Sequence, residues 1–497
     1  MIEYLWYESA SLAERAHVDT AAWHRGKHQS VGRLIAFASL GVPLAAVFLP
    51  LGVYLPPFYA QTMGLGLGTV GLVFMLSRFW NALCDPLIGI LSDHTHSRFG
   101  RRKPWIAAGA LVFIFAVASV YWPPRHLSAV HLGIALFALY LGWTMIGTPF
   151  AAWASELSTG YHERSRVQTF LQTGTALGLM LTLLLPALLD QLSARDAFEK
   201  IAAMGGFAIL TFVPSVLLVL LTFHEKSYVA PAHRASIFIA LRQFATNPLV
   251  LRVMASDFFV ATGQGIRGAL FVFYVSAYMG LPKWASLLFL LQFVFGVFAA
   301  PIWLRVGYRL GKHRTVVAGE ITQIAINLSL LFVGPGNFET LLALTVAQGL
   351  AQGSGNLMLR AIVSDIADDH RLKTGKEQSG LLFSIFNVTN NAAAAAAVGL
   401  AYPLIAWFGF VPGHANSHVA LSALAILFAV GPATGHFISA AFIWRFPLDE
   451  QRHAELRTAL DEQERAQRFA RVMSSDGGRN QTAGRTGPGS VFPQTIT

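Results

Sequence analysis

Three polar side chains share one face of a segment that is otherwise apolar. Arg78, Asn81 and Asp85 are spaced i, i+3 and i+7, which places them on the same side of a helix. A carboxylate within hydrocarbon is costly when ionised, so it is expected to be protonated, paired or bound to a cation. Asp85 can therefore carry a proton or hold a small cation. If Arg78 instead holds Asp85 as a fixed pair, the site is structural and couples nothing.

A second charged motif lies eight residues further along the chain. Asp93 precedes Gly100-Arg101-Arg102-Lys103, and it can pair with these arginines or cap a neighbouring helix N-terminus. Breaking a partly buried charged pair costs a few kcal/mol, enough to bias a conformational equilibrium. We therefore predict a conformational latch at Asp93, whereas Arg101 and Arg102 serve equally well as positively charged anchors. The same two interpretations apply to a further set of charges: Glu156, Arg164, Asp365 and Arg371.

The composition indicates that membrane-spanning helices position these side chains. Only 12% of the 497 residues are charged and 54% are hydrophobic, whereas soluble domains are about a quarter charged. Twelve segments approach the roughly twenty apolar residues that a helix needs to cross about 30 Å of hydrocarbon. The predicted spans are 32–59, 65–91, 105–123, 130–154, 167–189, 202–223, 249–279, 284–304, 316–334, 340–363, 379–408 and 416–444.

Lysine and arginine alternate between the loops, which predicts the topology. Alternate loops are basic and the intervening loops are poor in Lys and Arg, so both termini and the central linker are expected in the cytoplasm. Two motifs also recur about 210 residues apart: Gly100-Arg101-Arg102-Lys103 as Gly311-Lys312-His313-Arg314, and Ser155-Glu156 as Ser364-Asp365. Such repeats are typical of transporters built from duplicated halves.

These observations predict five regions. They are a cytoplasmic segment at 1–31, a six-helix half at 32–223, a cytoplasmic linker at 224–248, a second six-helix half at 249–446 and a cytoplasmic, largely disordered tail at 447–497.

Three stretches of sequence resemble the glycoside-pentoside-hexuronide:cation symporters of the major facilitator superfamily. They are Asp85-Pro86-Leu87-Ile88-Gly89 through Asp93 to Trp105, Pro149-Phe150 through Ser155-Glu156-Leu157 to Arg166, and Ser364-Asp365-Ile366-Ala367-Asp368-Asp369 with Thr374-Gly375. The resemblance covers about residues 32 to 444. It implies an all-α major facilitator fold of twelve transmembrane helices in two six-helix halves. It also implies alternating access of a central site.

The same resemblance implies a coupling site. In the resembling symporters the positions of Asn81 and Asp85 are both acidic and form the cation site together with a threonine that matches Thr144. Asn81 is neutral here, and Asn391 matches a lysine of the sodium-using relatives. Sodium prefers several hard oxygen ligands, whereas one carboxylate suffices for a proton. We therefore expect coupling to H+ rather than Na+.

A sugar site needs flat aromatic faces and hydroxyl-matching amides, and the predicted helices offer several. The candidates for the substrate cavity, besides Arg78 and Asn391, are Tyr54, Trp80, Tyr140, Trp143, Gln172 and Asn387. Aromatic residues equally form interfacial belts or pack in the core. Other ionisable groups at depth need partners, and either Arg78 or Arg360 is a possible partner for Asp257. The other two groups at depth are Arg267 and Glu320.

The sequence also excludes several function classes. Cys84 is the only cysteine, and neither a metal-ligand cluster nor a catalytic triad occurs at helical spacing, so we expect no metal, no cofactor and no enzyme activity. The net charge of +10 is explained by loops facing anionic lipid, not by nucleic acid. The expected protein is a monomer in the bacterial inner membrane that binds a glycoside-like solute. An amphiphile or lysolipid carrier and an uncoupled facilitator are the alternatives.

Overall fold

The computed structural model describes residues 29–95, 97–124, 126–157, 161–192, 196–225, 244, 246–374 and 379–448, with short parts of 451–463. All of the regular elements in these ranges are helical. The predicted segment 1–31, linker 224–248 and tail 447–497 lie mostly outside the described residues.

The N-terminal half begins with a broken span. Its pieces are α2 (Val31–Ala38), α3 (Gly41–Val53), α4 (Leu55–Pro57) and the π-helix η1 (Phe58–Thr62). Prolines lack the N–H that continues a helical ladder, and Pro50, Pro56 and Pro57 lie along this interrupted stretch. Five continuous helices complete the half: α5 (Leu67–His94), α6 (Lys103–Tyr121), α7 (Ala129–Glu156), α8 (Tyr161–Leu192) and α9 (Ala197–Thr222).

The C-terminal half repeats this pattern. Its first four spans are α11 (Pro248–Phe273) with η2 (Tyr274–Tyr278), η3 (Pro282–Trp284) with α12 (Ala285–Leu310), α13 (Lys312–Ser329) with η4 (Leu330–Phe332), and α14 (Phe338–Thr374). The last two are α15 (Ser379–Trp407) and α16 (His418–Ile443). The predicted all-α architecture of twelve helices in two halves is confirmed.

Hydropathy alone finds one span fewer than the structure has. Within the described residues, eleven helices are long and apolar enough to cross a membrane. The twelfth, α14, has 37 residues but is more polar, because it carries the buried Gln348, the half-buried Gln352 and a charged final turn. Several helices, α8 and α14 among them, also extend beyond the predicted spans, since apolar content marks only the part of a helix that lies in hydrocarbon.

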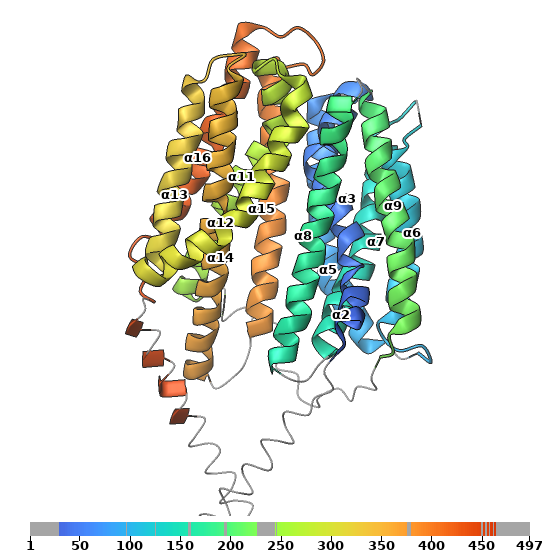
Figure 1. Cartoon of the computed structure of the whole chain (residues 1–497), viewed down its shortest axis with the longest axis vertical. Coiled ribbons are helices and arrows are strands. Elements are labelled where there is room, and N and C mark those ends of the chain that lie inside the picture. The colour runs from blue at the N-terminus through green and yellow to red at the C-terminus, as the bar shows by residue number, and fades with distance from the viewer. Residues whose placement is uncertain are drawn as a thin grey trace, which may run out of the picture.

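The two halves stand side by side and meet along paired helices (Figure 1). Helices α5 and α15 pack against each other across the interface, as do α8 and α12. Within a half, small residues permit close approach: a Cβ atom on Gly142 of α7 would lie 2.8 Å from the backbone nitrogen of Phe113 on α6. These contacts place α5 and α15 at the centre of the molecule.

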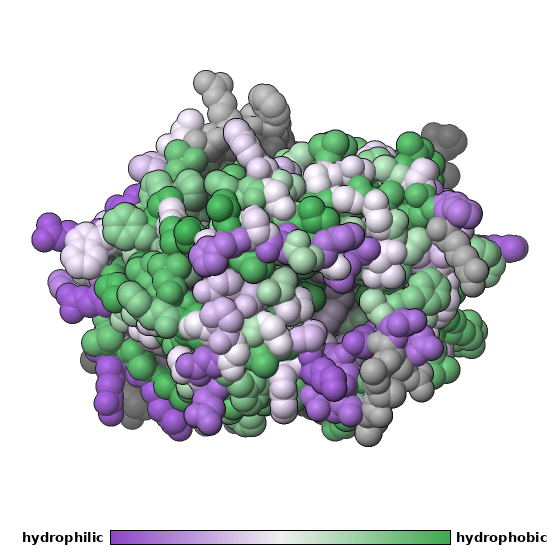
Figure 2. Space-filling view, turned by 90° about the horizontal axis from the view of Figure 1, so that it is seen from above, coloured by the Kyte–Doolittle hydropathy of each residue, from purple (hydrophilic) through white to green (hydrophobic). Residues whose placement is uncertain are grey.

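We call the end where the segment 225–246 joins the halves the linker end, and the opposite end the distal end. At the distal end, Tyr54 stacks edge-on against Phe289 of the other half with ring centroids 6.4 Å apart. Gln191 there donates a hydrogen bond of 3.2 Å to the backbone oxygen of Lys283. Figure 2 looks onto this end and shows hydrophilic side chains interspersed with hydrophobic ones. The halves are thus joined at their distal ends.

Candidate functional site

A polar cluster lies between α5 and α7, around the carboxyl group of Asp85. The Thr144 hydroxyl lies 2.8 Å from Oδ1 of Asp85 and 3.0 Å from Oδ1 of Asn81. Thr144 and Asn81 are buried. A hydroxyl has one proton and donates to one oxygen at a time, so Thr144 can switch its donor between the acid and the amide. The structure therefore brings together the three residues that the sequence proposed for coupling.

The same carboxyl group also contacts the other half of the protein. Asn391 on α15 donates from Nδ2 to Oδ2 of Asp85 at 3.4 Å. Its neighbour Asn390 makes the same contact, also at 3.4 Å, with Oδ2 of Asp257 on α11. Adjacent amides thus reach one carboxylate in each half. Asp85 is the point at which hydrogen bonds from both halves converge.

A central cavity of about 240 Å³ lies beside this cluster. Ring and aliphatic side chains form most of its wall, and both halves contribute to it. Its polar lining consists of Arg78, Gln264, Arg267, Gln292, Gln348 and Gln352. Arg78 lies three residues before Asn81 on α5, and the lining residue Ala394 lies three residues after Asn391 on α15. The Asp85 cluster is therefore about one helical turn from the cavity, on its linker-end side.

Arg78 lines the cavity and does not pair with Asp85. Its guanidinium lies over the ring of Phe48, 5.6 Å from the centroid, and Nε is buried without a hydrogen-bond partner. Among the described residues, no ion pair joins Arg78 to Asp85 or to Asp257. The fixed Arg78–Asp85 pair, which the sequence left open, is not present in this structure.

The predicted aromatic residues lie around the cavity rather than in its wall. Tyr54 is part of the distal contact with Phe289. Tyr140 is buried and close enough to Arg78 for electrostatic contact, while Trp143 packs on Phe48 at 5.6 Å. Trp80 lies on the far side of α5, because its Nε1 donates to the backbone oxygen of Phe137 at 3.2 Å and the side chain is exposed. None of the four is among the cavity-lining residues.

The two predicted amides outside the cluster are exposed. Gln172 on α8 and Asn387 on α15 do not line the cavity. Asn387 is one turn from Asn391 on the linker-end side, so it lies beyond the Asp85 cluster when viewed from the cavity. Of the predicted substrate residues, only Arg78 lines the cavity.

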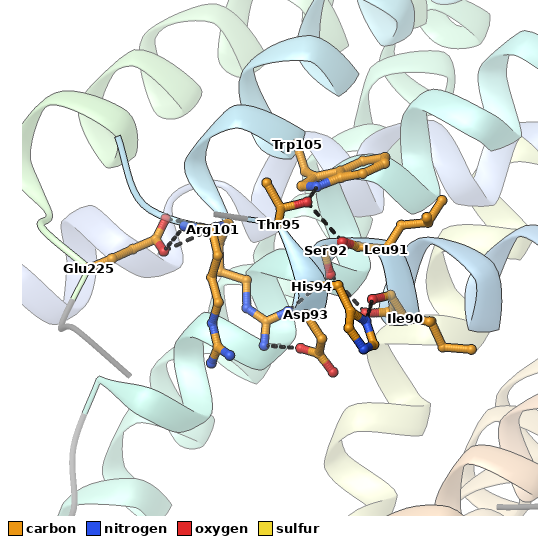
Figure 3. A network of polar contacts seen from close by, with 11 residues as sticks. Ile90, Leu91, Ser92, Asp93, His94, Thr95, Arg101, Trp105 and Glu225 are labelled. Carbon is orange, nitrogen blue, oxygen red and sulfur yellow. Dashed lines mark hydrogen bonds and ion pairs between the residues drawn. The ribbon is translucent and has the colours of Figure 1, made fainter. Parts of the chain in front are cut away.

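The charged motif at the linker end makes two separate anchors (Figure 3). Asp93 pairs with Arg102 at 2.7 Å, and Arg102 also donates to the hydroxyl of Ser92 at 3.0 Å. The N-terminus of α6 is capped by Glu225, not by Asp93. The Glu225 carboxylate accepts hydrogen bonds from the backbone N–H groups of residues 101, 102 and 103 at 2.6 to 3.0 Å.

The backbone at position 100 of this motif requires a glycine. Its φ of +104° is unfavourable for other residues, and a Cβ atom there would lie 2.5 Å from the Glu225 carboxyl carbon. The glycine thus lets a carboxylate approach the exposed N–H groups at the start of α6, where the helix dipole favours negative charge.

The C-terminal half carries a related contact at the matching place. Lys312 donates to both oxygens of Asp365 at 2.8 and 2.7 Å, joining the start of α13 to α14. Arg371 lies in the last turn of α14. The side chains of Glu156 and Arg164 lie outside the described residues. The Asp93–Arg102 and Lys312–Asp365 pairs each lie within one half, so neither joins the two halves in this conformation.

The four cavity glutamines were not predicted from the sequence. Glu320 was predicted to lie within the membrane, but its partner was not predicted. Glu320 on α13 contacts Nδ1 of His436 on α16, and Ser439 donates to its other oxygen at 3.3 Å. All three side chains are buried. The glutamines could have been identified from the sequence, because an uncharged amide within an apolar span must also find a hydrogen-bond partner. Asp257 has Arg360 as an electrostatic neighbour, one of the two partners considered.

A family model described as "MFS/sugar transport protein" matches residues 36–450. The chain belongs to the MFS/sugar transport family. It is 24% identical to the isoprimeverose transporter of Lactiplantibacillus pentosus, covering 82% of this chain and 89% of that protein. It is 26% identical to a putative glycoside/cation symporter of Escherichia coli, covering 76% and 83%. The resemblance to glycoside-pentoside-hexuronide:cation symporters is thereby confirmed.

Solved structures share the fold of this MFS/sugar transport protein. The crystal structure of a D-xylose-proton symporter aligns with a TM-score of 0.61 at 14% identity, covering 84% of this chain and 98% of that one. The inward-open xylose transporter XylE from E. coli aligns with a TM-score of 0.58 at 15% identity, covering 86% and 99%. The family is one of membrane transporters, so the expectation that the protein is not an enzyme is confirmed.

Proposed function

We propose that this protein is a secondary active transporter that moves a small, glycoside-like organic solute together with a proton by alternating access. The observation that carries the proposal is the position of Asp85. One carboxyl group accepts hydrogen bonds from Thr144 in its own half and from Asn391 in the other half, about two turns along α5 from the cavity residue Arg78. A proton that binds there changes contacts in both halves at once.

The proton acts through the hydrogen bonds of Asp85. An ionised carboxylate accepts only, so it favours the donors Thr144 and Asn391, whereas a protonated carboxyl group has a donor of its own. Protonation therefore weakens the attraction for the Asn391 amide and frees α5 to move against α15. This coupling is the differential interaction that a proton needs in order to shift a conformational equilibrium.

The ligands around Asp85 support H+ as the coupling ion. The cluster offers one carboxylate, with Asn81 and Thr144 as neutral neighbours, and Asn391 presents an N–H donor to the remaining oxygen. Sodium prefers several oxygen ligands and charge compensation. We expect sodium at constant pH to change solute affinity little.

The proposed transport cycle uses the two halves as rocking units. With the termini and the linker in the cytoplasm, as the loop charges favour, the distal contacts would lie on the periplasmic side, and we assign this conformation as closed there. The location would be the bacterial inner membrane. The pairs at Asp93 and Lys312 would exchange partners across the halves when the linker end closes, as a latch does.

The size and polarity of the cavity support a small hydroxylated solute over an amphiphile. Its volume of about 240 Å³ is below the roughly 300–1,000 Å³ of sites for drug-sized ligands. Its glutamines suit hydroxyl groups, whereas a lysolipid needs a long apolar surface. The printed names of relatives, a transporter of isoprimeverose and a glycoside/cation symporter, are consistent with this class.

The deciding experiment compares Asp85→Asn with Asp257→Asn in proteoliposomes that take up radiolabelled glycosides from the outside medium. Each change replaces a carboxyl group that accepts from an α15 asparagine, so the two variants are chemically matched. We expect Asp85→Asn to lose accumulation driven by a pH gradient while solute exchange persists. Full accumulation by this variant would exclude Asp85 as the proton carrier.

A further inference from the structure

Helix α12 leaves more of its surface uncovered than the other apolar spans do. Only 22% of the residues in its most apolar stretch are buried, the lowest share among the eleven apolar spans of the described residues. The uncovered surface of a helix in a bilayer faces either a cavity or lipid. The direction of each side of α12 therefore decides what can bind there.

One side of α12 faces the cavity and α14. Phe289 and Phe293 line the cavity. Nearer the linker end, a Cβ atom on Gly307 would lie 2.7 Å from Cε of Met358 on α14. Phe289 and Gly307 are eighteen residues apart, which is about five full helical turns, so both point to the same side.

The opposite side of α12 is first apolar and then basic. Phe298 and Ile302 are 64% and 49% exposed, and the exposed Arg305 and Arg309 follow them. At about 100° per residue, these four positions lie about 160° to 220° around the helix axis from Phe289. We call these four side chains the α12 stripe. The stripe faces away from the cavity and thus towards lipid.

The two arginines of the α12 stripe lie at the edge of the hydrocarbon. Residues Ala285 to Leu304 carry no charge, and Arg305 is twenty residues from Ala285, about 30 Å along the helix. This length equals the thickness of the hydrocarbon core, about 30 Å. Arg305 and Arg309 therefore lie at the level of the lipid headgroups. Tyr308 is 76% exposed and supplies a hydroxyl group at the same level.

These guanidinium groups have no counter-ion within the part of the chain that the structure describes. No ion pair there includes Arg305, Arg309 or the exposed Arg314 in the first turn of α13. A single residue separates α12 from α13, so the three arginines lie at one corner of the fold. Asp365 at this end pairs with Lys312 instead. The corner thus carries a surplus of positive charge at headgroup level.

We propose that the α12 stripe is a binding site for an anionic phospholipid. The lipid phosphate is held by Arg305 and Arg309, and an acyl chain lies along Ile302 and Phe298. The planar fork of arginine matches phosphate oxygens. A zwitterionic lipid already carries an ammonium group near its phosphate, so it should bind more weakly. The site lies outside the cavity and does not depend on the proposed function.

The test compares lipids that differ in headgroup charge. Phosphatidylglycerol and phosphatidylcholine with the same acyl chains are added to the purified full-length protein in detergent, and bound lipid is measured by native mass spectrometry. We expect phosphatidylglycerol to bind about tenfold more tightly, because it adds a net negative charge beside two arginines. Equal binding of the two lipids would overturn the proposal.

Inorganic phosphate and glycerol phosphate are further arms of this experiment. Both carry the anionic group without an acyl chain, so neither should displace phosphatidylglycerol at equal concentration. Displacement by either compound would mean that the arginines bind a simple anion and that the apolar part of the stripe contributes nothing, which also overturns the proposal.

Single variants assign the effect to the α12 stripe. Arg305→Gln and Arg309→Gln should each reduce the preference for phosphatidylglycerol about fivefold, and Arg305→Lys should keep most of it. Arg98→Gln is the matched control, because Arg98 is exposed and precedes Gly100 by two residues, as Arg309 precedes Gly311. An equal loss in Arg98→Gln would indicate diffuse attraction to all basic loops and contradict a local site.

Melting temperatures show that the variants remain folded. The substituted side chains are exposed, so the melting temperature in detergent without added lipid should not change. Phosphatidylglycerol should raise the melting temperature of the wild type more than phosphatidylcholine does, and the double variant Arg305→Gln/Arg309→Gln should lose this difference. A double variant that is equally stable and keeps the full preference would refute the proposal.

Discussion

Asn391 of the C-terminal half donates a hydrogen bond to Asp85 of the N-terminal half at 3.4 Å, while the adjacent Asn390 donates one of the same length to Asp257 within its own half. Two neighbouring amides of α15 thus serve different purposes. The Asn391–Asp85 contact crosses the interface between the halves, whose opening and closing is proposed to drive transport. The Asn390–Asp257 contact lies within one half. This pair of residues supplies its own internal control.

Replacing Asn391 with alanine is expected to loosen the coupling between protonation and movement of the halves. A hydrogen bond to a carboxylate at this length contributes about 1 kcal/mol, which corresponds to roughly a fivefold change in an equilibrium. We expect about that change in the ratio of proton-driven uptake to exchange, measured in proteoliposomes. Asn390→Ala should leave the ratio within twofold, and an equal effect of both variants would argue against a special role for the interface contact.

Removing the hydroxyl of Thr144 should impair the same step. Thr144→Val keeps the shape of the side chain but leaves Asp85 and Asn81 without their shared donor. Leaving a buried acceptor unsatisfied costs about 1–3 kcal/mol. We expect proton-driven uptake to fall at least fivefold in Thr144→Val and to remain near normal in Thr144→Ser. Comparable losses in the two variants would mean that packing, not the hydroxyl, matters there.

Glu225 is expected to stabilise the linker end of the N-terminal half. Its carboxylate accepts from three backbone N–H groups at the start of α6. Glu225→Gln removes the negative charge at a helix N-terminus, a loss of about 1–2 kcal/mol in a partly buried position. The melting temperature in detergent should fall by a few degrees, whereas the exposed Glu339→Gln in the first turn of α14 should leave it unchanged. A stable Glu225→Gln variant would show that the cap is dispensable.

Gly142 should tolerate no side chain larger than hydrogen. A Cβ atom there would lie 2.8 Å from the backbone nitrogen of Phe113, so the two helices would have to separate. Overpacking of this kind costs about 1–3 kcal/mol. We expect Gly142→Ala to lower the melting temperature clearly and Gly133→Ala, on the same helix with its nearest neighbouring atom 3.9 Å away, to have little effect. Equal melting temperatures for the two variants would mean that the α6–α7 contact adjusts at little cost.

The sequence by itself determined the class of the protein, its helices and the centre of its polar cluster. Apolar stretches of membrane-spanning length predict helices, because hydrocarbon offers no hydrogen-bond partner for an exposed backbone N–H or C=O. Asp85, Asn81 and Arg78 were identifiable as one face because helical spacing fixes relative direction within a single element. Thr144 and Asn391 entered through resemblance to a family, not through spacing.

Only the tertiary structure decided which of these side chains meet and which line the cavity. Arg78 and Asp85 share a face of α5, yet Arg78 lines the cavity whereas Asp85, two turns further along, contacts Asn391. Trp80 was a reasonable candidate until its contact with Phe137 placed it on the opposite side. The cap at α6 comes from Glu225, more than a hundred residues distant in sequence. Such choices depend on the rotation of each helix about its axis and on contacts between distant segments, and both arise only when all the helices pack together.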